Sequence, residues 1–450
     1  MIKRFKSFFL AVLFLSCVFS GNVHAQVSLQ FSIEPQMAVD MALRNNLGLH
    51  SARLGLDISR RRSAYAWNQL VPSISVAGNL SRENWATVQM GMTLPQWRVN
   101  GAFSTSLDFS FALFEAMRSA RLDYEAGIIS YDKASLQIEQ AVRKMYNNIL
   151  LLQANQALLT ESLDNTIRQA HIAEANFRAG LALRLTWLQA QVAVENLRPT
   201  VSDLENNLST LMGNFALILG LPFDTVFELQ PVSFGIMDIP PDVSALISRA
   251  AQYKPDILEL QASILALDSQ RKAISLQQFT PFLRLGWNLT SLFDPMLDPF
   301  GGDLFTADNW NRGGNFTLTL GMSFTPFLPF TREAQQRRDM QANIEIQNTR
   351  LAQMIQETEL EIFTKINSLN RIITTADVQR TAVNLAEESY RLTEEAYRAG
   401  LQDFQSVRSA ALALEQARLQ FLTQQFNYLN DLIDLEYAIG VPFGTLSSWN

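Results

Sequence analysis

The chain has 450 residues, of which 48% are hydrophobic and 18% charged, so it is too apolar for a disordered protein and must bury surface when it folds. Its 36 Lys and Arg residues stand against 43 Asp and Glu residues, a net charge of −7, and no basic cluster indicates nucleic-acid binding. A single cysteine and three histidines are too few for disulfide frameworks, for zinc sites with cysteine or several histidine ligands, and for most triad enzymes.

The first 25 residues have the pattern of a signal peptide. A basic start is followed by an apolar stretch at residues 8–19 and by a small-residue cleavage pattern that ends at Ala25. We therefore predict a signal peptide at residues 1–25 and a mature chain that begins at Gln26. The alternative is a lipoprotein acylated at Cys17, but this cysteine lies inside the apolar stretch rather than after it. No later stretch is long and apolar enough to predict a transmembrane helix.

The mature chain contains the same unit twice. The sequence Phe-Arg-Ala-Gly-Leu at residues 177–181 recurs as Tyr-Arg-Ala-Gly-Leu at residues 397–401. Leu-Gly-Leu-Pro-Phe at residues 219–223 recurs, at the same offset, as Ile-Gly-Val-Pro-Phe at residues 439–443. Two motifs in one register indicate a duplication, which we divide into repeat 1 at residues 26–230 and repeat 2 at residues 231–450.

Repeat 1 is predicted to begin with a helix and a β-hairpin. Residues 34–70 have helical periodicity, and residues 73–113 alternate between apolar and small or polar side chains, which predicts a hairpin. Residues 115–179 contain no proline and predict a very long helix that ends at a tight turn near Gly180. A shorter helix is expected at residues 185–219.

Repeat 2 follows the same order. A helix is predicted at residues 243–279, a hairpin at residues 282–326, a long helix at residues 332–399 and a turn near Gly400, after which another helix follows. Residues 293–314 are rich in Asp, Asn, Gly and Pro, so we expect a loop insertion there.

The two long helices would each measure nearly 100 Å, since they have about 65 residues with a rise of about 1.5 Å per residue. The shorter helices of each repeat together reach a similar length, so we expect them to lie end to end along a long helix. Pro199 is expected to kink or break the helix that contains it. The Gln, Asn and Ala residues of these helices suit a surface that faces water on one side, although an ordinary antiparallel coiled-coil bundle explains them equally well.

The strand segments of both hairpins have one apolar face and one small or polar face. Their length of about ten residues is typical of transmembrane β-strands, and a soluble sandwich with one wet face is the alternative. Asp108, Arg284 and Asn288 fall on the polar faces, and we assign them to the lumen of a barrel, where water tolerates charge. Three tryptophans near the strands fit either an interfacial aromatic girdle or ordinary loop packing: Trp85, Trp97 and Trp310.

Two hairpins make a four-stranded sheet with two open edges. Unpaired backbone groups at such edges are costly in hydrocarbon, so a membrane-embedded sheet must close on itself. Since eight strands are the usual minimum for a membrane barrel, several chains must contribute to one barrel. Strand arithmetic permits either a dimer with eight strands or a trimer with twelve.

Several short motifs accompany these elements. The most specific are the two aromatic-Arg-Ala-Gly-Leu sequences, each followed by a helix that ends in Gly-Leu-Pro or Gly-Val-Pro. Others are Ala42-Leu43-Arg44-Asn45-Asn46, Leu70-Val71-Pro72-Ser73 and Phe111-Ala112-Leu113-Phe114. Together these motifs resemble the TolC-like outer-membrane efflux proteins, which are the exit ducts of tripartite pumps and type I secretion systems.

This resemblance implies an α+β membrane protein with two internal repeats, each with a transmembrane β-hairpin and long helices. It implies a homotrimer whose twelve-stranded β-barrel lies in outer-membrane lipid and continues as an α-helical barrel across the periplasm. It also implies a periplasmic adaptor (membrane fusion) protein and an inner-membrane transporter as partners, with no nucleic acid and no cofactor.

The glycine turns would then form the periplasmic tip, where the helices narrow to a gate and meet the adaptor. The residues that the resemblance assigns to this tip are Gly180, Leu181, Arg184, Thr186, Gly400, Leu401, Asp403 and Ser406. Family members often carry an aspartate six residues after each glycine, where this chain has Thr186 and Ser406. The ionic partners and the ion selectivity of the gate therefore cannot be transferred.

The sequence as a whole predicts a non-enzymatic duct that exports substrates across the periplasm and the outer membrane. The alternatives are a type I protein-secretion duct rather than small-molecule efflux, and a passive porin-like or structural tube. The long helices argue against a simple porin. We interpret Glu387-Glu388 and Glu394-Glu395 as solvated helix surface rather than catalytic carboxylates, and His171 as a surface or packing residue.

Overall fold

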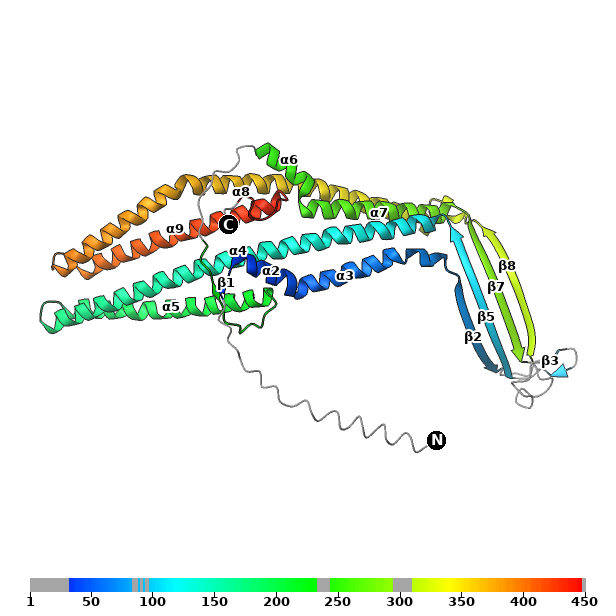
Figure 1. Cartoon of the computed structure of the whole chain (residues 1–450), viewed down its shortest axis with the longest axis horizontal. Helices are drawn as coiled ribbons and strands as arrows, with labels where there is room; N and C mark the ends of the chain where they lie inside the picture. Colours follow the sequence, from blue (N-terminus) through cyan, green and yellow to red (C-terminus); the bar gives the residue numbers. More distant parts are fainter. Residues whose placement is uncertain are drawn as a thin grey trace, which may run out of the picture.

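The computed structural model describes residues 32–82, 88–89, 92–93, 97–232, 243–293 and 310–446. It is an elongated molecule with a bundle of long helices and, at one end of the bundle, a curved sheet (Figure 1). The predicted signal peptide, the alternative lipid site at Cys17, and Trp85 lie outside the described residues, as does the side chain of Trp97.

The opening helix of each repeat is interrupted, which differs from the continuous helices expected at residues 34–70 and 243–279. In repeat 1, α2 (Pro35–Asn45) and α3 (Leu47–Ala64) meet at Asn46, and the 3₁₀-helix η1 (Ala66–Leu70) follows. The Asn46 side chain accepts from the backbone N–H of Leu49 at 3.1 Å, so it caps α3.

In repeat 2, the interruption separates α6 (Val243–Tyr253) from α7 (Pro255–Phe279). It falls at Lys254, which has an extended conformation because the following proline disfavours a helical one. The two repeats therefore share the break but build it with different residues.

The hairpins form one four-stranded sheet, in the order β2-β5-β7-β8, in which every neighbouring pair is antiparallel. Its strands are β2 (Ser73–Arg82), β5 (Trp97–Ser110), β7 (Phe282–Phe293) and β8 (Trp310–Gly321). The pairing of β5 with β7 joins the two repeats, and β2 and β8 are the open edges. Two minor pairs complete the strands: β1 (Ser32–Ile33) with β6 (Glu228–Leu229), and β3 (Val88–Gln89) with β4 (Met92–Thr93).

The strands are shorter than expected at their helical ends. Strand β5 stops at Ser110 and helix α4 begins at Ala112, so the last residues expected in the first hairpin are helical. After β8 comes the 3₁₀-helix η3 (Thr325–Phe327). Residues 310–314 belong to β8 rather than to a loop insertion, and residues 294–309 lie outside the described residues.

Each repeat is organised around one helix of 67 residues, α4 (Ala112–Arg178) or α8 (Arg332–Arg398). At about 1.5 Å per residue, each is about 100 Å long. Helices α3 and α5 (Arg184–Ile218) lie one after the other along α4, and α7 and α9 (Phe404–Ala438) lie likewise along α8 (Figure 1). Helix α4 also contacts α7 and α9, so it connects the repeats.

A kink or a break was expected at Pro199; helix α5 runs through this residue without interruption, so the break is wrong. Proline removes one backbone hydrogen bond, but α5 packs against α4 in a buried cluster on each side of it. Val201 and Leu204, just beyond the proline, pack with Leu159 of α4 in a small buried cluster.

The two largest hydrophobic clusters lie midway along the bundle, one in each repeat. In repeat 1, the buried Tyr146 donates its hydroxyl to the carbonyl oxygens of Ile33 and Gln230, both at 2.8 Å, and thereby holds the β1–β6 pair against α4. Among the described helices, none combines the length and the hydropathy that a membrane crossing requires.

Candidate channel surfaces

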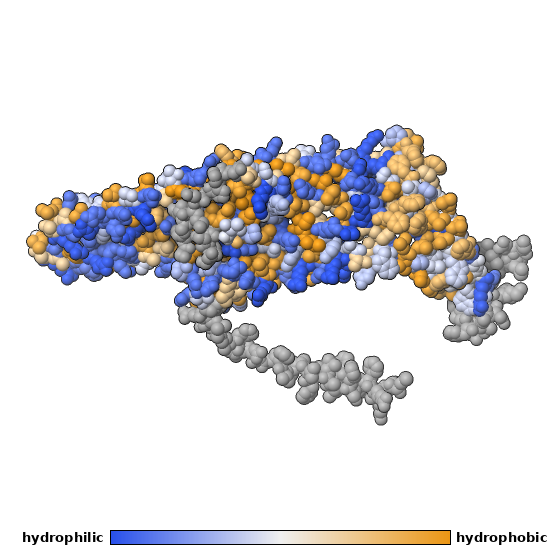
Figure 2. Space-filling view, turned by 45° about the horizontal axis from the view of Figure 1, so that its top comes forward, coloured by the Kyte–Doolittle hydropathy of each residue, from blue (hydrophilic) through white to orange (hydrophobic). Residues whose placement is uncertain are grey.

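One face of the sheet is apolar and open to the surroundings. Side chains that lie directly opposite each other in antiparallel strands share a face, and Leu107, Leu285 and Leu318 are opposite one another on β5, β7 and β8. Val76 is 80% exposed and Leu318 is 62% exposed, although both are aliphatic strand residues. Hydrophobic residues dominate the visible surface of the sheet in Figure 2. An apolar surface of this extent marks contact with lipid or with another protein.

The other face of the sheet is polar. Asp108 and Arg284 are opposite each other on β5 and β7, and the Arg284 Nε lies 2.5 Å from Asp108 Oδ1. On the same face Asn288 is opposite Ser104, whose hydroxyl lies 2.6 Å from that of Ser75. The three residues expected in the lumen thus share one face, and two of them form an ion pair that the sequence did not predict.

The tip of repeat 1 is a helix reversal at Gly180, which has a φ of 75°. The N–H of Leu181 donates to the carbonyl of Asn176 at 2.8 Å, and the N–H of Gly180 donates to that of Phe177 at 3.0 Å. This pair of bonds is a Schellman motif, which requires a left-handed residue and therefore favours glycine. Leu181 is 80% exposed at the turn.

The tip of repeat 2 has the same turn at Gly400, with a φ of 76°, and Leu401 is equally exposed. It differs in its N-cap: Asp403 Oδ1 accepts from both the backbone N–H and the hydroxyl of Ser406, at 2.8 and 2.6 Å. These bonds hold the pKa of Asp403 below its usual range.

Two of the charged residues expected at the tip therefore do not form a lock within one chain. Asp403 is engaged as the cap of α9, and Arg184, which is exposed, has no ion pair with any described residue. In repeat 1 the N-cap position is Leu183, which has no side-chain cap, and Thr186 is half-buried on the first turn of α5. The two tips thus have the same backbone turn but different side chains at the start of the following helix.

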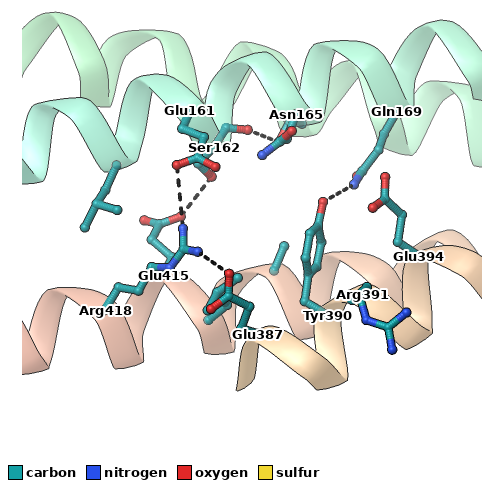
Figure 3. A pocket seen from close by; sticks show the side chains of 14 residues that line it. Glu161, Ser162, Asn165, Gln169, Glu387, Tyr390, Arg391, Glu394, Glu415 and Arg418 are labelled. Atoms are coloured by element: carbon teal, nitrogen blue, oxygen red, sulfur yellow. Dashed lines mark hydrogen bonds and ion pairs between the residues drawn. The ribbon is translucent and has the colours of Figure 1, made fainter. Parts of the chain in front are cut away.

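A polar cluster between α4, α8 and α9 lines a pocket of about 270 Å³ (Figure 3). Ser162 donates to Glu415 at 2.9 Å, and Gln169 donates to the hydroxyl of Tyr390 at 3.3 Å. Arg418 lies between Glu387, at 3.0 Å, and Glu161, at 3.6 Å. Glu387 is thus a contact between α8 and α9 rather than a merely solvated residue.

The remaining acidic residues of that region behave as expected from the sequence. Glu388 and Glu395 pair with Arg391 on the exposed surface of α8, and the half-buried Glu394 pairs with Arg398. His171 has a side chain that is 75% exposed and lies 4.0 Å from Glu174.

A second polar cluster joins the repeats midway along the bundle. Lys365 of α8 bonds to Asp431 at 2.7 Å and to Asp434 at 2.6 Å, both on α9. Lys144 of α4 reaches the other oxygen of Asp434 at 2.8 Å, and Ser368 donates to Asp431 at 2.8 Å. Burial disfavours the charged form of Asp434 and by itself would raise its pKa. The hydrogen bonds and charges of Lys144 and Lys365 outweigh this effect and hold the pKa of Asp434 below its usual range.

Sequence reasoning missed both polar clusters. Their members lie up to 290 residues apart in the chain, and each residue by itself has the polarity of an ordinary helix surface. No group of three or more potential metal ligands occurs among the described residues.

Three comparisons bear on this arrangement. The outer membrane efflux protein family matches residues 38–221. The antibiotic efflux pump outer membrane protein ArpC of Pseudomonas putida is 24% identical over 426 residues, which span 91% of this chain and 84% of ArpC.

Solved structures have the same fold. The outer membrane protein VceC of Vibrio cholerae superposes with a TM-score of 0.71 at 17% identity, covering 91% of this chain and 96% of VceC. The CmeC outer membrane channel of Campylobacter jejuni gives a TM-score of 0.72 at 17% identity, covering 92% of this chain and 87% of CmeC. The duplicated helices and the four-stranded sheet thus have the fold of these outer-membrane channels, and within that fold residues 38–221 match the outer membrane efflux protein family.

Proposed function

We propose that three copies of this chain form a twelve-stranded barrel in the outer membrane, and that their helices continue it as a hollow tube across the periplasm. The observation that carries the proposal is the open four-stranded sheet, apolar on one face and polar on the other, at the end of helices about 100 Å long. Strand β8 of one copy would pair with β2 of the next, which would satisfy the backbone groups at both edges.

In this assembly the apolar sheet face contacts lipid and the polar face, with Asp108, Arg284 and Asn288, lines the lumen. The two glycine turns lie at the opposite end and form the gate and the contact with a periplasmic adaptor, which links the duct to an inner-membrane transporter. The exposure of Leu181 and Leu401 supports a protein contact at this end.

We favour small-molecule export as the function, because ArpC, which matches over most of both chains, is named an antibiotic efflux pump protein. The same duct would suit type I protein secretion, so that function is the second candidate. The third candidate is a passive porin-like tube, and the long helices argue against it because such a tube does not need them.

Imaging of the purified full chain in detergent tests the architecture. A ring with threefold symmetry and a helical extension of about 100 Å is expected. Twofold symmetry would support the eight-stranded dimer, and a compact monomer that is soluble without detergent would contradict the proposal.

Conductance across a planar bilayer tests the gate. We expect a small conductance from the intact chain and a larger one after deletion of the turns around Gly180 and Gly400. An unchanged conductance after both deletions would show that the tips do not close the duct.

A further inference from the structure

A pocket of about 500 Å³ lies where the sheet meets the helices. It is formed by α7, by the start of α8, and by the segment that connects β8 to α8. Four of its lining residues are basic and four are apolar or aromatic: Arg271, Lys272, Arg337, Arg338, Pro326, Phe327, Pro329 and Ala334. The proposed duct does not require basic and apolar side chains to lie together at this junction of the sheet and the helices.

The positive charge of the pocket is incompletely balanced. Arg271 and Lys272 share one carboxylate, that of Asp268, each at 2.8 Å. Arg337 donates only to neutral oxygens, the amide of Gln278 at 2.6 Å and the carbonyl of Pro326 at 3.1 Å. Arg338 has no ion pair or hydrogen bond with a described residue. Two of the four cations therefore share one anion, and the other two have no ion pair among the described residues.

The neighbouring surface of α8 does not add to this charge. Arg332, Glu333 and Asp339 line a separate shallow pocket, in which acidic residues outnumber basic ones. The excess of positive charge in the pocket between α7 and α8 thus does not extend into this neighbouring pocket.

The wall of the pocket toward the sheet is apolar and exposed. Phe327 is 55% exposed, Leu328 is 46% exposed and Phe330 is 83% exposed, all in one short segment. Arg337 holds this segment in place, because it binds the Pro326 carbonyl while its guanidinium lies 4.4 Å from the centre of the Phe279 ring. The Phe279 ring in turn packs edge-on against Phe327 at 5.0 Å.

The pocket is therefore a fixed site, cationic on one side and apolar on the other, at the boundary between the hydrophobic sheet and the hydrophilic helices. Figure 2 shows this boundary as a change from hydrophobic to strongly hydrophilic surface next to the sheet. Basic residues that border an apolar surface attract anionic lipid headgroups, while the aromatic residues suit the interface.

We propose that this pocket binds the phosphodiester of an anionic phospholipid, whose acyl chains then cover Phe327, Phe330 and the adjacent sheet. The inference rests on the proposed function, which places the sheet in the outer membrane and the pocket at the level of its periplasm-facing headgroups. The bound lipid would fix the depth at which the sheet meets the bilayer.

The test compares lipid binding by the purified full chain in a neutral detergent, measured by native mass spectrometry with short-chain phosphatidylglycerol and phosphatidylcholine. The variant Lys272→Gln/Arg338→Gln removes two cations and leaves Arg337, which positions the wall, unchanged. The matched control Arg350→Gln/Arg380→Gln removes two exposed cations farther along the same helix. Inorganic phosphate serves as competitor.

We expect the wild-type chain and the control to prefer phosphatidylglycerol, and the pocket variant to bind it about tenfold or more weakly, since each basic residue near an anionic surface contributes about a fivefold effect. Binding of phosphatidylcholine should not change. Equal loss in the control, or no preference in the wild type, would overturn the proposal. Complete displacement by millimolar phosphate would identify a free-anion site instead of a lipid site.

Two further outcomes separate this inference from the proposed function. A pocket variant that loses oligomers but keeps its lipid preference would show that the pocket is an interface between copies. A wild-type chain that fractionates with membranes yet shows no lipid preference would refute the lipid site alone, whereas a chain that never enters membranes would refute the duct.

Discussion

Lys144 of α4 and Asp434 of α9 form an ion pair of 2.8 Å that connects the two repeats across 290 residues of sequence. Asp434 also holds Lys365 of α8 at 2.6 Å, so one carboxylate joins three helices. Its side chain is 13% exposed, which makes the cluster the most enclosed charged contact between the repeats that we describe.

Replacement of this carboxylate should destabilise the bundle. Asp434→Asn leaves two half-buried ammonium groups without their shared partner, and we expect a loss of roughly 1–3 kcal/mol, less than for a fully buried pair because both lysines retain some solvent. Thermal unfolding of the detergent-solubilised chain measures the effect. The control Asp377→Asn, on the exposed surface of α8, should unfold at the wild-type temperature.

The same cluster predicts that the stability of the folded chain depends on pH. Because the pKa of Asp434 is lower in the folded chain than in the unfolded chain, its contribution is present above the unfolded pKa of about 3.9 and is lost as the pH falls through the folded pKa. The difference in melting temperature between the wild type and Asp434→Asn should be constant from about pH 6 to 8 and shrink below about pH 4. A difference that grows in acid would contradict the assignment.

The two faces of the sheet should respond differently to charge. Leu318→Asp places a carboxylate on the apolar face and should impair assembly in the membrane, at a cost of a few kcal/mol. Thr319→Asp lies on the polar face directly opposite Arg284 and should be tolerated. The amount of oligomer in the outer-membrane fraction is the measurement, and equal effects would mean that the faces have been assigned incorrectly.

The repeated glycines offer a matched pair of substitutions. Gly400 and Gly440 have φ values of 76° and 64° and end helices with the same hydrogen-bond pattern, but a Cβ at Gly400 would meet no atom within 4 Å, whereas one at Gly440 would lie 2.4 Å from the carbonyl oxygen of Tyr253. Gly400→Ala should therefore cost about 1 kcal/mol from backbone strain alone. Gly440→Ala should cost about 3 kcal/mol or more, because the backbone of Tyr253 must also move. Chemical unfolding of both variants checks the order, and similar losses would argue against the close contact at Gly440.

The sequence predicts the repetitive part of this fold well, because its signals are local. Proline-free stretches define α4 and α8, glycines at positive φ end them, and alternation marks the strands. The break before Pro255 had a local signal, because proline disfavours a helical residue before it. Asp403 had one too, because aspartate is among the preferred N-cap residues.

What the sequence could not supply depends on long-range pairing. The ion pair between Asp108 and Arg284 requires the register of β5 on β7, and the contact between Gln169 and Tyr390 requires the register of two helices from different repeats. The helix continues through Pro199 for the same reason, because the packing of α5 along α4 outweighs the local tendency of proline to end a helix.

The unpaired edges at β2 and β8 have a consequence for how the protein reaches its final state. A solitary chain can complete its helices, whose backbone bonds are all internal, but its sheet offers two rows of free donors and acceptors to whichever strand arrives first. In the proposed assembly these edges pair between copies, so the stability of the sheet should rise with the concentration of chains, and dilution should loosen the strands before the long helices. Assembly would then be a kinetic competition between pairing with further copies of this chain and pairing with strands of other proteins.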